Sequence, residues 1–183
     1  MRLMPLLLVI VLLFCLNTVG MAQVDENAAD TLKLSAAKLM DGNKVAVIVD
    51  FFNDQPLAAL TIPLRLGAKG FEIDTVLLTD SRIDYLHTKP ITITEDRQGV
   101  VFGGICMTEA YIPAGNGLLA TIVLRQTGTE LAKDCIIDTT TIIPANTLFT
   151  KPDSKSFVPV VQMGKMKIGK QESDPPKDTA KKE

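Results

Sequence analysis

The sequence predicts an all-β protein: an antiparallel two-sheet β-sandwich of eight or nine strands, of the jelly-roll type. Residues 42–169 contain short runs rich in β-branched residues, with turn residues about every 8 to 12 positions. The run at 57–66 also alternates strictly, with Leu60 and Ile62 on one side and Thr61 and Arg65 on the other. A period of two is typical of a strand that has one buried face and one solvated face.

Residues 30–79 supply four strands, each ended by turn chemistry. The second strand alternates Val45, Val47, Val49 and Phe51 as its core face. Gly, Asn and Pro residues separate the runs because they tolerate or impose the backbone angles of turns. Only residues 36–40 and 80–86 have a pattern compatible with a helical turn. The four strands are expected at residues 30–35, 44–52, 57–66 and 71–79.

Pro63 interrupts the third strand. It stands on the side that alternation predicts to be solvated, together with Ala59, Thr61 and Arg65. Proline cannot donate a ladder hydrogen bond, so we expect it at a sheet edge or a bulge.

The second half begins with a hairpin. Its strands are residues 91–95 and 100–105, and Asp96 to Gly99 forms the loop between them. Three more strands are expected at residues 118–125, 135–143 and 157–169. In the last of these we expect four side chains to point inward: Val158, Val160, Met166 and Ile168.

The first 22 residues have the composition of a cleavable signal peptide. Arg2 is followed by the apolar run 3–16, and Gly20-Met21-Ala22 offers the small-x-small pattern of a cleavage site before Gln23. The apolar run is shorter than the ~20 residues needed to span a bilayer. We therefore expect a secreted, periplasmic or cell-surface protein with no membrane span after cleavage.

The rest of the chain suits one domain. We expect a loose segment at 23–30, the sandwich at 31–169 and a disordered charged tail at 170–183, which reads KQESDPPKDTAKKE. The formal net charge is −2, and no block of Lys or Arg accompanies aromatic residues. Nucleic acid is therefore not an expected partner.

Catalytic and metal sites are not expected, and neither is a cofactor. His87 is the one histidine and lies in a polar stretch, YLHTKP, where we assign it to an exposed loop. Together with Cys106 and Cys135 it falls short of a four-ligand zinc set. Asn53 and Asp54 are assigned to capping of the turn after the second strand rather than to calcium binding.

The order and spacing of the strands resemble those of cohesin domains across residues 31–169. The segments that carry the resemblance are IPLRLG at 62–67, FEI at 71–73, ITITEDRQGVVFGGICMTEAYIPAGNGLLATIVL at 91–124 and the closing GKMKIG. The resemblance implies a cohesin-type β-sandwich that binds a protein partner and catalyses no reaction.

The resemblance also implies where a partner would dock. Cohesins that bind dockerins carry an Asn and an Asp on the outward face of the strand aligned with 57–66, where this chain has Ala59 and Thr61. A related partner would use this face through Thr61, Arg65, Thr92 and Thr94. The alternative is that these residues are ordinary solvated positions of a sheet.

Carbohydrate binding is the alternative function, because the cohesin fold is similar to that of several carbohydrate-binding modules. Sugar-binding platforms use aromatic side chains that stack on pyranose rings. The chain has no Trp and only two tyrosines, Tyr85 and Tyr111, which are the sugar-contact candidates beside Asp84 and Glu109.

The two cysteines of the mature chain give conflicting signals. An oxidising compartment favours a disulfide between Cys106 and Cys135. The cohesin-like strand order instead places these residues toward opposite ends of one sheet. We therefore expect two buried, unreactive thiols.

Overall fold

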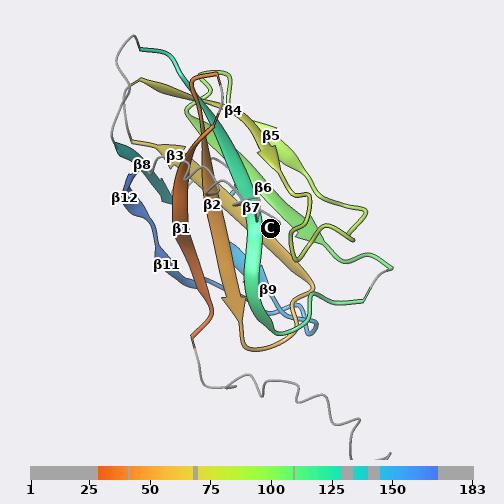
Figure 1. Ribbon diagram of the computed structural model, residues 1–183. Helices are drawn as coiled ribbons and strands as arrows, with labels where there is room; N and C mark the ends of the chain where they lie inside the picture. The colour runs from red at the N-terminus through yellow and green to blue at the C-terminus, as the bar shows by residue number, and fades with distance from the viewer. Residues whose placement is uncertain are drawn as a thin grey trace, which may run out of the picture.

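The computed structural model describes residues 29–40, 42–67, 70–108, 110–128, 134–139 and 145–168. These residues form two β-sheets packed face to face, and none of them is helical. In Figure 1, β1, β2 and β7 cross in front of β3, β6 and β9. The twelve strands are β1 (Thr31–Met40), β2 (Lys44–Asn53), β3 (Ala59–Leu66), β4 (Phe71–Leu77), β5 (Ile91–Ile93), β6 (Gly99–Ile105), β7 (Gly115–Gln126), β8 (Asp134–Thr139), β9 (Leu148–Thr150), β10 (Ser156–Phe157), β11 (Val160–Gln162) and β12 (Gly164–Lys167).

The predicted all-β sandwich is confirmed. One sheet has the order β11-β1-β2-β7-β4 and is antiparallel except for the parallel pair of β1 and β11. The other runs β10-β9-β3-β6-β5, and β8 also pairs with β3 and with β12. Twelve strands replace the eight or nine expected because the segment after Pro144 forms several short strands.

The core lies between the two sheets and follows the alternation read from the sequence. Phe51 of β2 and Phe149 of β9 are fully buried and meet edge-to-face, with ring centroids 6.0 Å apart. Leu60, Ile62 and Leu64 of β3 are each at most 2% exposed. Burying a side chain of this size contributes about 1.5–3 kcal/mol, so these contacts hold the sheets together.

Pro63 lies where β3 changes the strand with which it pairs. The sequence predicted a solvated Pro63, but the residue is buried. The Leu66 N–H bonds the Gln98 carbonyl at 2.7 Å. Hydrogen-bonded pairs alternate along an antiparallel ladder, so the Pro63 nitrogen points away from β6. On that side β9 pairs with residues 59–61 and β8 with residues 64–66. Pro63 therefore falls between the described pairings, where a missing donor breaks no ladder bond.

The outer edge of β4 is bonded at residues 71–74 to the loop between β5 and β6. The Ile73 N–H donates to the Arg97 carbonyl at 2.8 Å, and Arg97 donates through Nε to Ile73 O and through Nη2 to Asp74 O. Gln98 Nε2 donates to Phe71 O at 2.9 Å. The β5–β6 loop of one sheet thus forms hydrogen bonds with backbone N–H and C=O groups of β4, the edge strand of the other sheet.

Some local details differ from the expectations. Of the two segments compatible with a helical turn, residues 36–40 continue β1 after a bulge between Leu34 and Ala36. Residues 80–86 form a series of turns, in which the Asp84 N–H bonds Ser81 O and the Leu86 N–H bonds Ile83 O. Val158 and Val160 are 66% and 47% exposed rather than inward, whereas Ile168 packs against the core.

Some predictions fall outside the described residues. They are the signal peptide at 1–22, most of the 23–30 segment, the tail at 170–183, and the side chains of Cys135 and Met166. The described residues contain no helix that is both long and apolar enough to cross a membrane.

The strand order used to separate the cysteines is confirmed. β6 and β8 flank β3, and both are antiparallel to it. The Cys106 N–H bonds Ala58 O, whereas Cys135 lies two residues before Ile137, which pairs with Leu66. At ~3.3 Å per residue these positions are about 30 Å apart along the strands. Cys106 itself is half-buried rather than buried.

Candidate functional site

The predicted partner residues share one surface, the outward side of β9, β3, β6 and β5, which we call the β3 face. The strand register places these residues side by side. Arg65 pairs with Gly99, and the Gly99 carbonyl accepts the Thr94 N–H. Thr92 pairs with Val101, which in turn pairs with Pro63. The side chains of this face are Ala59, Thr61, Arg65, Thr92, Thr94, Val101, Ile105, Leu148 and Thr150. Arg65, Thr92 and Ile105 are exposed and the others are half-buried. The structure therefore brings all five predicted partner residues onto one face.

One end of the β3 face is polar. Arg65 Nη2 donates to Asp96 Oδ2 at 2.7 Å, and the Thr94 hydroxyl donates to Asp96 Oδ1. The backbone N–H of Gln98 donates to the same Oδ1 at 3.0 Å. The hydroxyl of Thr94, then the Gln98 N–H and Arg65, lower the pKa of Asp96 to about 2. Asp96 thus stays ionised and fixes the Arg65 guanidinium at this end.

Gly103 keeps the middle of the face flat. It pairs with Thr61, and a Cβ built on it would lie 2.1 Å from the Leu60 carbonyl oxygen. Real Cβ contacts are never that short, so no other residue fits without moving β6 from β3. Thr61 therefore has bare backbone beside it on β6 and Leu148 beside it on β9.

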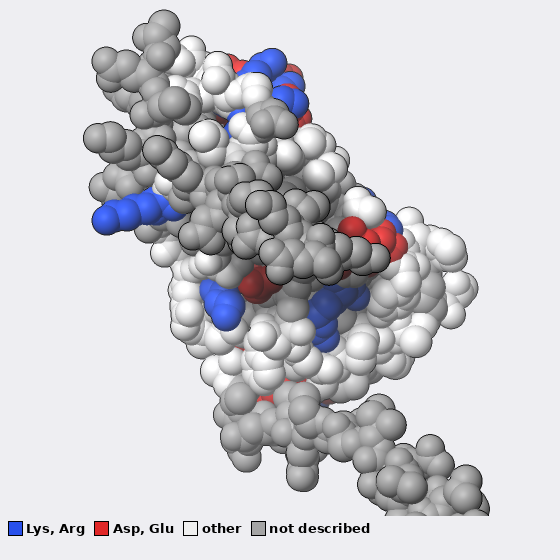
Figure 2. Space-filling view, viewed as in Figure 1, with Lys and Arg blue, Asp and Glu red and all other residues white. Residues whose placement is uncertain are grey.

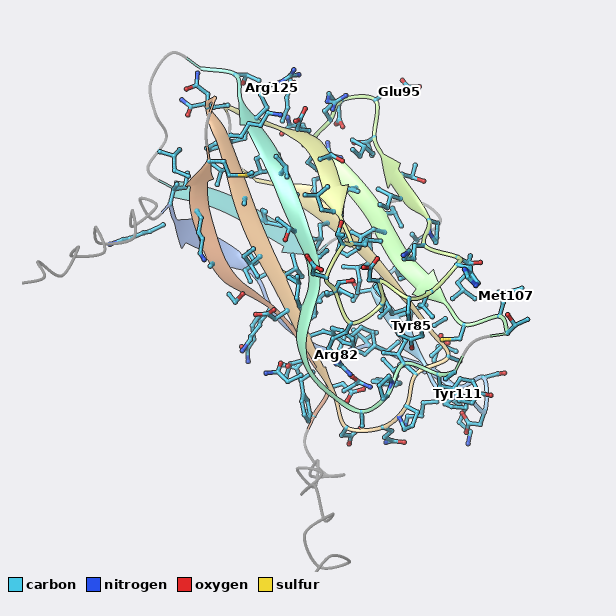
Figure 3. All side chains as sticks on the ribbon, turned by 45° about the vertical axis from the view of Figure 1, so that its right-hand side comes forward. Arg82, Tyr85, Glu95, Met107, Tyr111 and Arg125 are labelled. Atoms are coloured by element: carbon cyan, nitrogen blue, oxygen red, sulfur yellow. The ribbon has the colours of Figure 1, made fainter. Side chains whose placement is uncertain are left out.

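The other end of the face is apolar and continues onto two loops. We name this group the loop-end cluster: Tyr85, Ile105, Met107 and Tyr111, which are 46%, 40%, 70% and 50% exposed. Figure 3 shows Tyr85, Met107 and Tyr111 at one end of the molecule, with Glu95 and Arg125 at the opposite end. Figure 2 shows mostly uncharged surface toward the right of its view, where Figure 1 draws these loops. Tyr and Met at such exposure are the residue types enriched at protein interfaces.

The structure thus brings the two sugar-contact candidates to the same end. The Tyr85 hydroxyl donates to the Ala110 carbonyl at 3.2 Å, so the ring is held against the second loop. Asp84 bonds Lys89 Nζ at 3.2 Å and accepts the Asp80 N–H, which lowers its pKa. Glu109 lies outside the described residues.

Arg82 fixes the loops that carry the cluster. Its Nη1 donates to Asn53 Oδ1 and to Gly115 O, both at 2.8 Å, and Nη2 donates to Pro113 O. The guanidinium carbon lies 4.3 Å from the centre of the Phe51 ring. Partial burial lowers the pKa of Arg82 from its ordinary value. Arg82 therefore joins the end of β2, the loop after β4 and the start of β7.

Asn53 completes this network and holds the turn, as the sequence predicted. It is fully buried, and its Nδ2 donates to Gln55 O at 2.7 Å and to Pro113 O at 3.0 Å. With Oδ1 accepting from Arg82, the amide is occupied by protein groups. Within the part of the chain that the structure describes, no three His, Cys, Asp or Glu residues are placed to hold a metal ion.

Ile105, Met107 and Arg82 are the site residues that sequence reasoning missed. Ile105 has the outward parity of β6 and could have been found by extending the alternation through Val101 and Gly103. Met107 and Arg82 lie in loops, where no period predicts orientation.

Comparison with protein families gives no match, and comparison with curated protein sequences gives none. Solved structures do match. A type I cohesin–dockerin complex from Clostridium thermocellum is 15% identical with a TM-score of 0.62, covering 78% of this chain and 100% of that one. The sixth cohesin of scaffoldin B from Acetivibrio cellulolyticus is 12% identical with a TM-score of 0.63, covering 78% and 100%. A non-cellulosomal cohesin from Archaeoglobus fulgidus is 17% identical with a TM-score of 0.59, covering 79% and 94%.

Proposed function

The chain has a cohesin-type fold, and we propose that it is an exported, non-catalytic binding module whose β3 face docks a protein partner. The observation that carries the proposal is the continuity of that face. A fixed ion pair at Arg65 and Asp96 lies at one end, and the apolar loop-end cluster lies at the other. The two ends are about 20 Å apart, judged from six residues of strand at ~3.3 Å each. A surface of this length suits one standard protein interface of ~800 Å² per partner.

The chemistry of the face selects the kind of partner. Similar structures include complexes of cohesins with dockerins, which supports a protein ligand. The outward positions that would carry Asn and Asp are Ala59 and Thr61 here, so charge-assisted hydrogen bonds worth about 1.5–3 kcal/mol each would be missing. The partner is therefore a protein that contributes apolar side chains to the loop-end cluster, and it differs from a cellulosomal dockerin.

The experiment compares two arginine substitutions on opposite sheets. Thr61→Arg places a large charge in the middle of the β3 face, and Thr75→Arg places the same charge on exposed β4. The mature protein and both variants serve as baits for cross-linking on the cells that export it. Each captured protein is then purified and titrated by calorimetry.

A partner held by wild type and Thr75→Arg, with affinity reduced at least tenfold by Thr61→Arg, is the expected result. Equal loss with both substitutions, or with neither, would place the interface elsewhere.

Carbohydrate binding stays a second candidate because Tyr85 and Tyr111 lie at one end and are half-exposed. We expect weak or no retardation in affinity electrophoresis against cellulose, xylan and chitin derivatives, since no stacked aromatic platform is formed by the described residues. Strong retardation that is lost on Tyr85→Ala or Tyr111→Ala would instead favour a sugar ligand.

A further inference from the structure

Asp30 is a buried carboxylate at the entry to β1 that the binding face does not use. It is 7% exposed, and its Oδ2 is a buried oxygen with no hydrogen-bond partner. Its other oxygen, Oδ1, accepts the Asp54 N–H at 2.7 Å, and its backbone carbonyl accepts the Val160 N–H at 2.7 Å. Asp30 therefore joins the start of β1 to the β2–β3 connection and to β11.

A second carboxylate belongs to the residue that binds Asp30. The Asp54 N–H donates to Asp30 Oδ1, and the negative charge of the Asp54 side chain acts on Asp30, as does the positive charge of Lys151. An ionised Asp30 would leave Oδ2 without a donor and opposite another negative charge. A protonated Oδ2 could instead donate to the Asp54 carboxylate, and both oxygens of Asp30 would then be satisfied.

We propose that Asp30 is protonated in the folded protein and donates a hydrogen bond to Asp54, so that the junction of β1, the β2–β3 connection and β11 is held by a pH-dependent contact. The proton comes from solvent, binds Asp30 Oδ2 and is donated to Asp54. Loss of the proton leaves two facing carboxylates and weakens the junction.

The direction of the effect follows from the charges. Burial is the largest cause that raises the pKa of Asp30 to about 6. The Asp54 side chain raises this pKa further, through charge repulsion and through a hydrogen bond that favours the neutral acid. The Asp54 N–H and Lys151 act in the opposite direction and lower it. The pKa of Asp30 is higher in the folded protein than in the unfolded chain. The contribution of protonated Asp30 to stability is therefore fully present below pH ~4 and is lost as pH rises through about 6. A shift of this size changes the unfolding constant by up to ~100-fold between those limits.

The test follows carboxyl carbons by NMR and unfolding by urea in the mature protein. We expect the Asp30 carboxyl to titrate near pH 6 in the wild type and at lower pH in Asp54→Asn, because the asparagine can donate to an ionised Asp30. We expect Asp30→Asn, whose amide can donate to Asp54, to remove the stability difference between pH 5 and pH 7.5. Asp74→Asn is the control: hydrogen bonding from Lys44 lowers the pKa of Asp74, so the wild-type difference should remain.

Two outcomes would overturn the proposal. One is an Asp30 carboxyl that titrates near the ordinary value of about 3.9 in the wild type and is unchanged by Asp54→Asn. The other is stabilisation of the wild type by added Ca²⁺ at pH 7.5, absent in Asp30→Asn, which would show that the pair holds a cation.

Discussion

At the scale of single residues, Gly103 and Thr61 determine what the β3 face can accept. The close approach of Leu60 O excludes a side chain at position 103. Thr61, which pairs with Gly103, has a short side chain, so no large side chain projects from these two positions. Arg65, by contrast, is tied to Asp96 and presents a guanidinium in a fixed place. The face is therefore flat in its middle, with chemical character concentrated at its two ends.

Gly103→Ala should lower the free energy of unfolding by about 1–3 kcal/mol, the range for forcing an extra carbon into a packed site. The clash is with backbone, so β6 must move from β3. Urea unfolding measures the change, and Gly128→Ala is the control because its Cβ would meet nothing within 4 Å. Equal stability of the two variants would mean that β3 and β6 are not held at this spacing.

At the scale of elements, the loops of the loop-end cluster are ordered by polar contacts that are mostly half-buried. Arg82 supplies donors to three acceptors, and Asn53 supplies two more bonds from the end of β2. Gly115 and Gly117, with φ of +150° and +155°, let the start of β7 pass close to the Arg82 side chain. A loop surface organised in this way loses little entropy when it binds.

Arg82→Ala should destabilise the protein by about 2–4 kcal/mol, because Asn53 Oδ1 and Gly115 O would lose the Arg82 donor and an acceptor left without a donor costs about 1–3 kcal/mol. Arg82→Lys should recover only part of this, since one ammonium group cannot serve three acceptors in a plane. Arg125→Ala removes an exposed ion pair with Glu72 and should cost no more than about 1 kcal/mol. Urea unfolding followed by circular dichroism compares the three; similar losses for Arg82→Ala and Arg125→Ala would contradict the network.

The strand order makes a prediction about redox state. Because β6 and β8 are parallel to each other on either side of β3, Cys106 and Cys135 lie far beyond the ~7 Å Cα separation that a disulfide tolerates. Thiol labelling of the mature protein in urea without reductant should count both thiols. A count of zero would mean that the strand order differs from the one described.

At the scale of the whole molecule, the sequence predicted the sandwich because its long central strands alternate. β2 and β3 keep their parity along most of their length, so the core side could be assigned in advance. After Pro144 the alternation of residues did not predict which side chains are buried. The short strands there lie at the margins of the sheets, and Val158 and Val160 are exposed. Pro63 lies between the residues of β3 that pair with β9 and those that pair with β8, and the loop-end cluster depends on two separate loops. Neither is encoded in a local period.

Export is the prediction that concerns the chain as a whole. Arg2, the apolar run and Gly20-Met21-Ala22 predict a mature protein that begins near Gln23 outside the cytoplasm. Mass spectrometry of secreted and periplasmic fractions should find that N-terminus. A cytosolic protein that retains Met1 would contradict it.

The cover on β4 has a consequence for the protein at high concentration. An uncovered edge strand offers unpaired N–H and C=O groups to a second molecule and is a starting point for aggregation. Arg97 and Gln98 already bond Phe71, Ile73 and Asp74 along this edge, so a neighbouring chain finds the hydrogen-bonding positions at residues 71–74 occupied. At high concentration, copies of this domain would thus be kept from joining sheet to sheet through this part of β4.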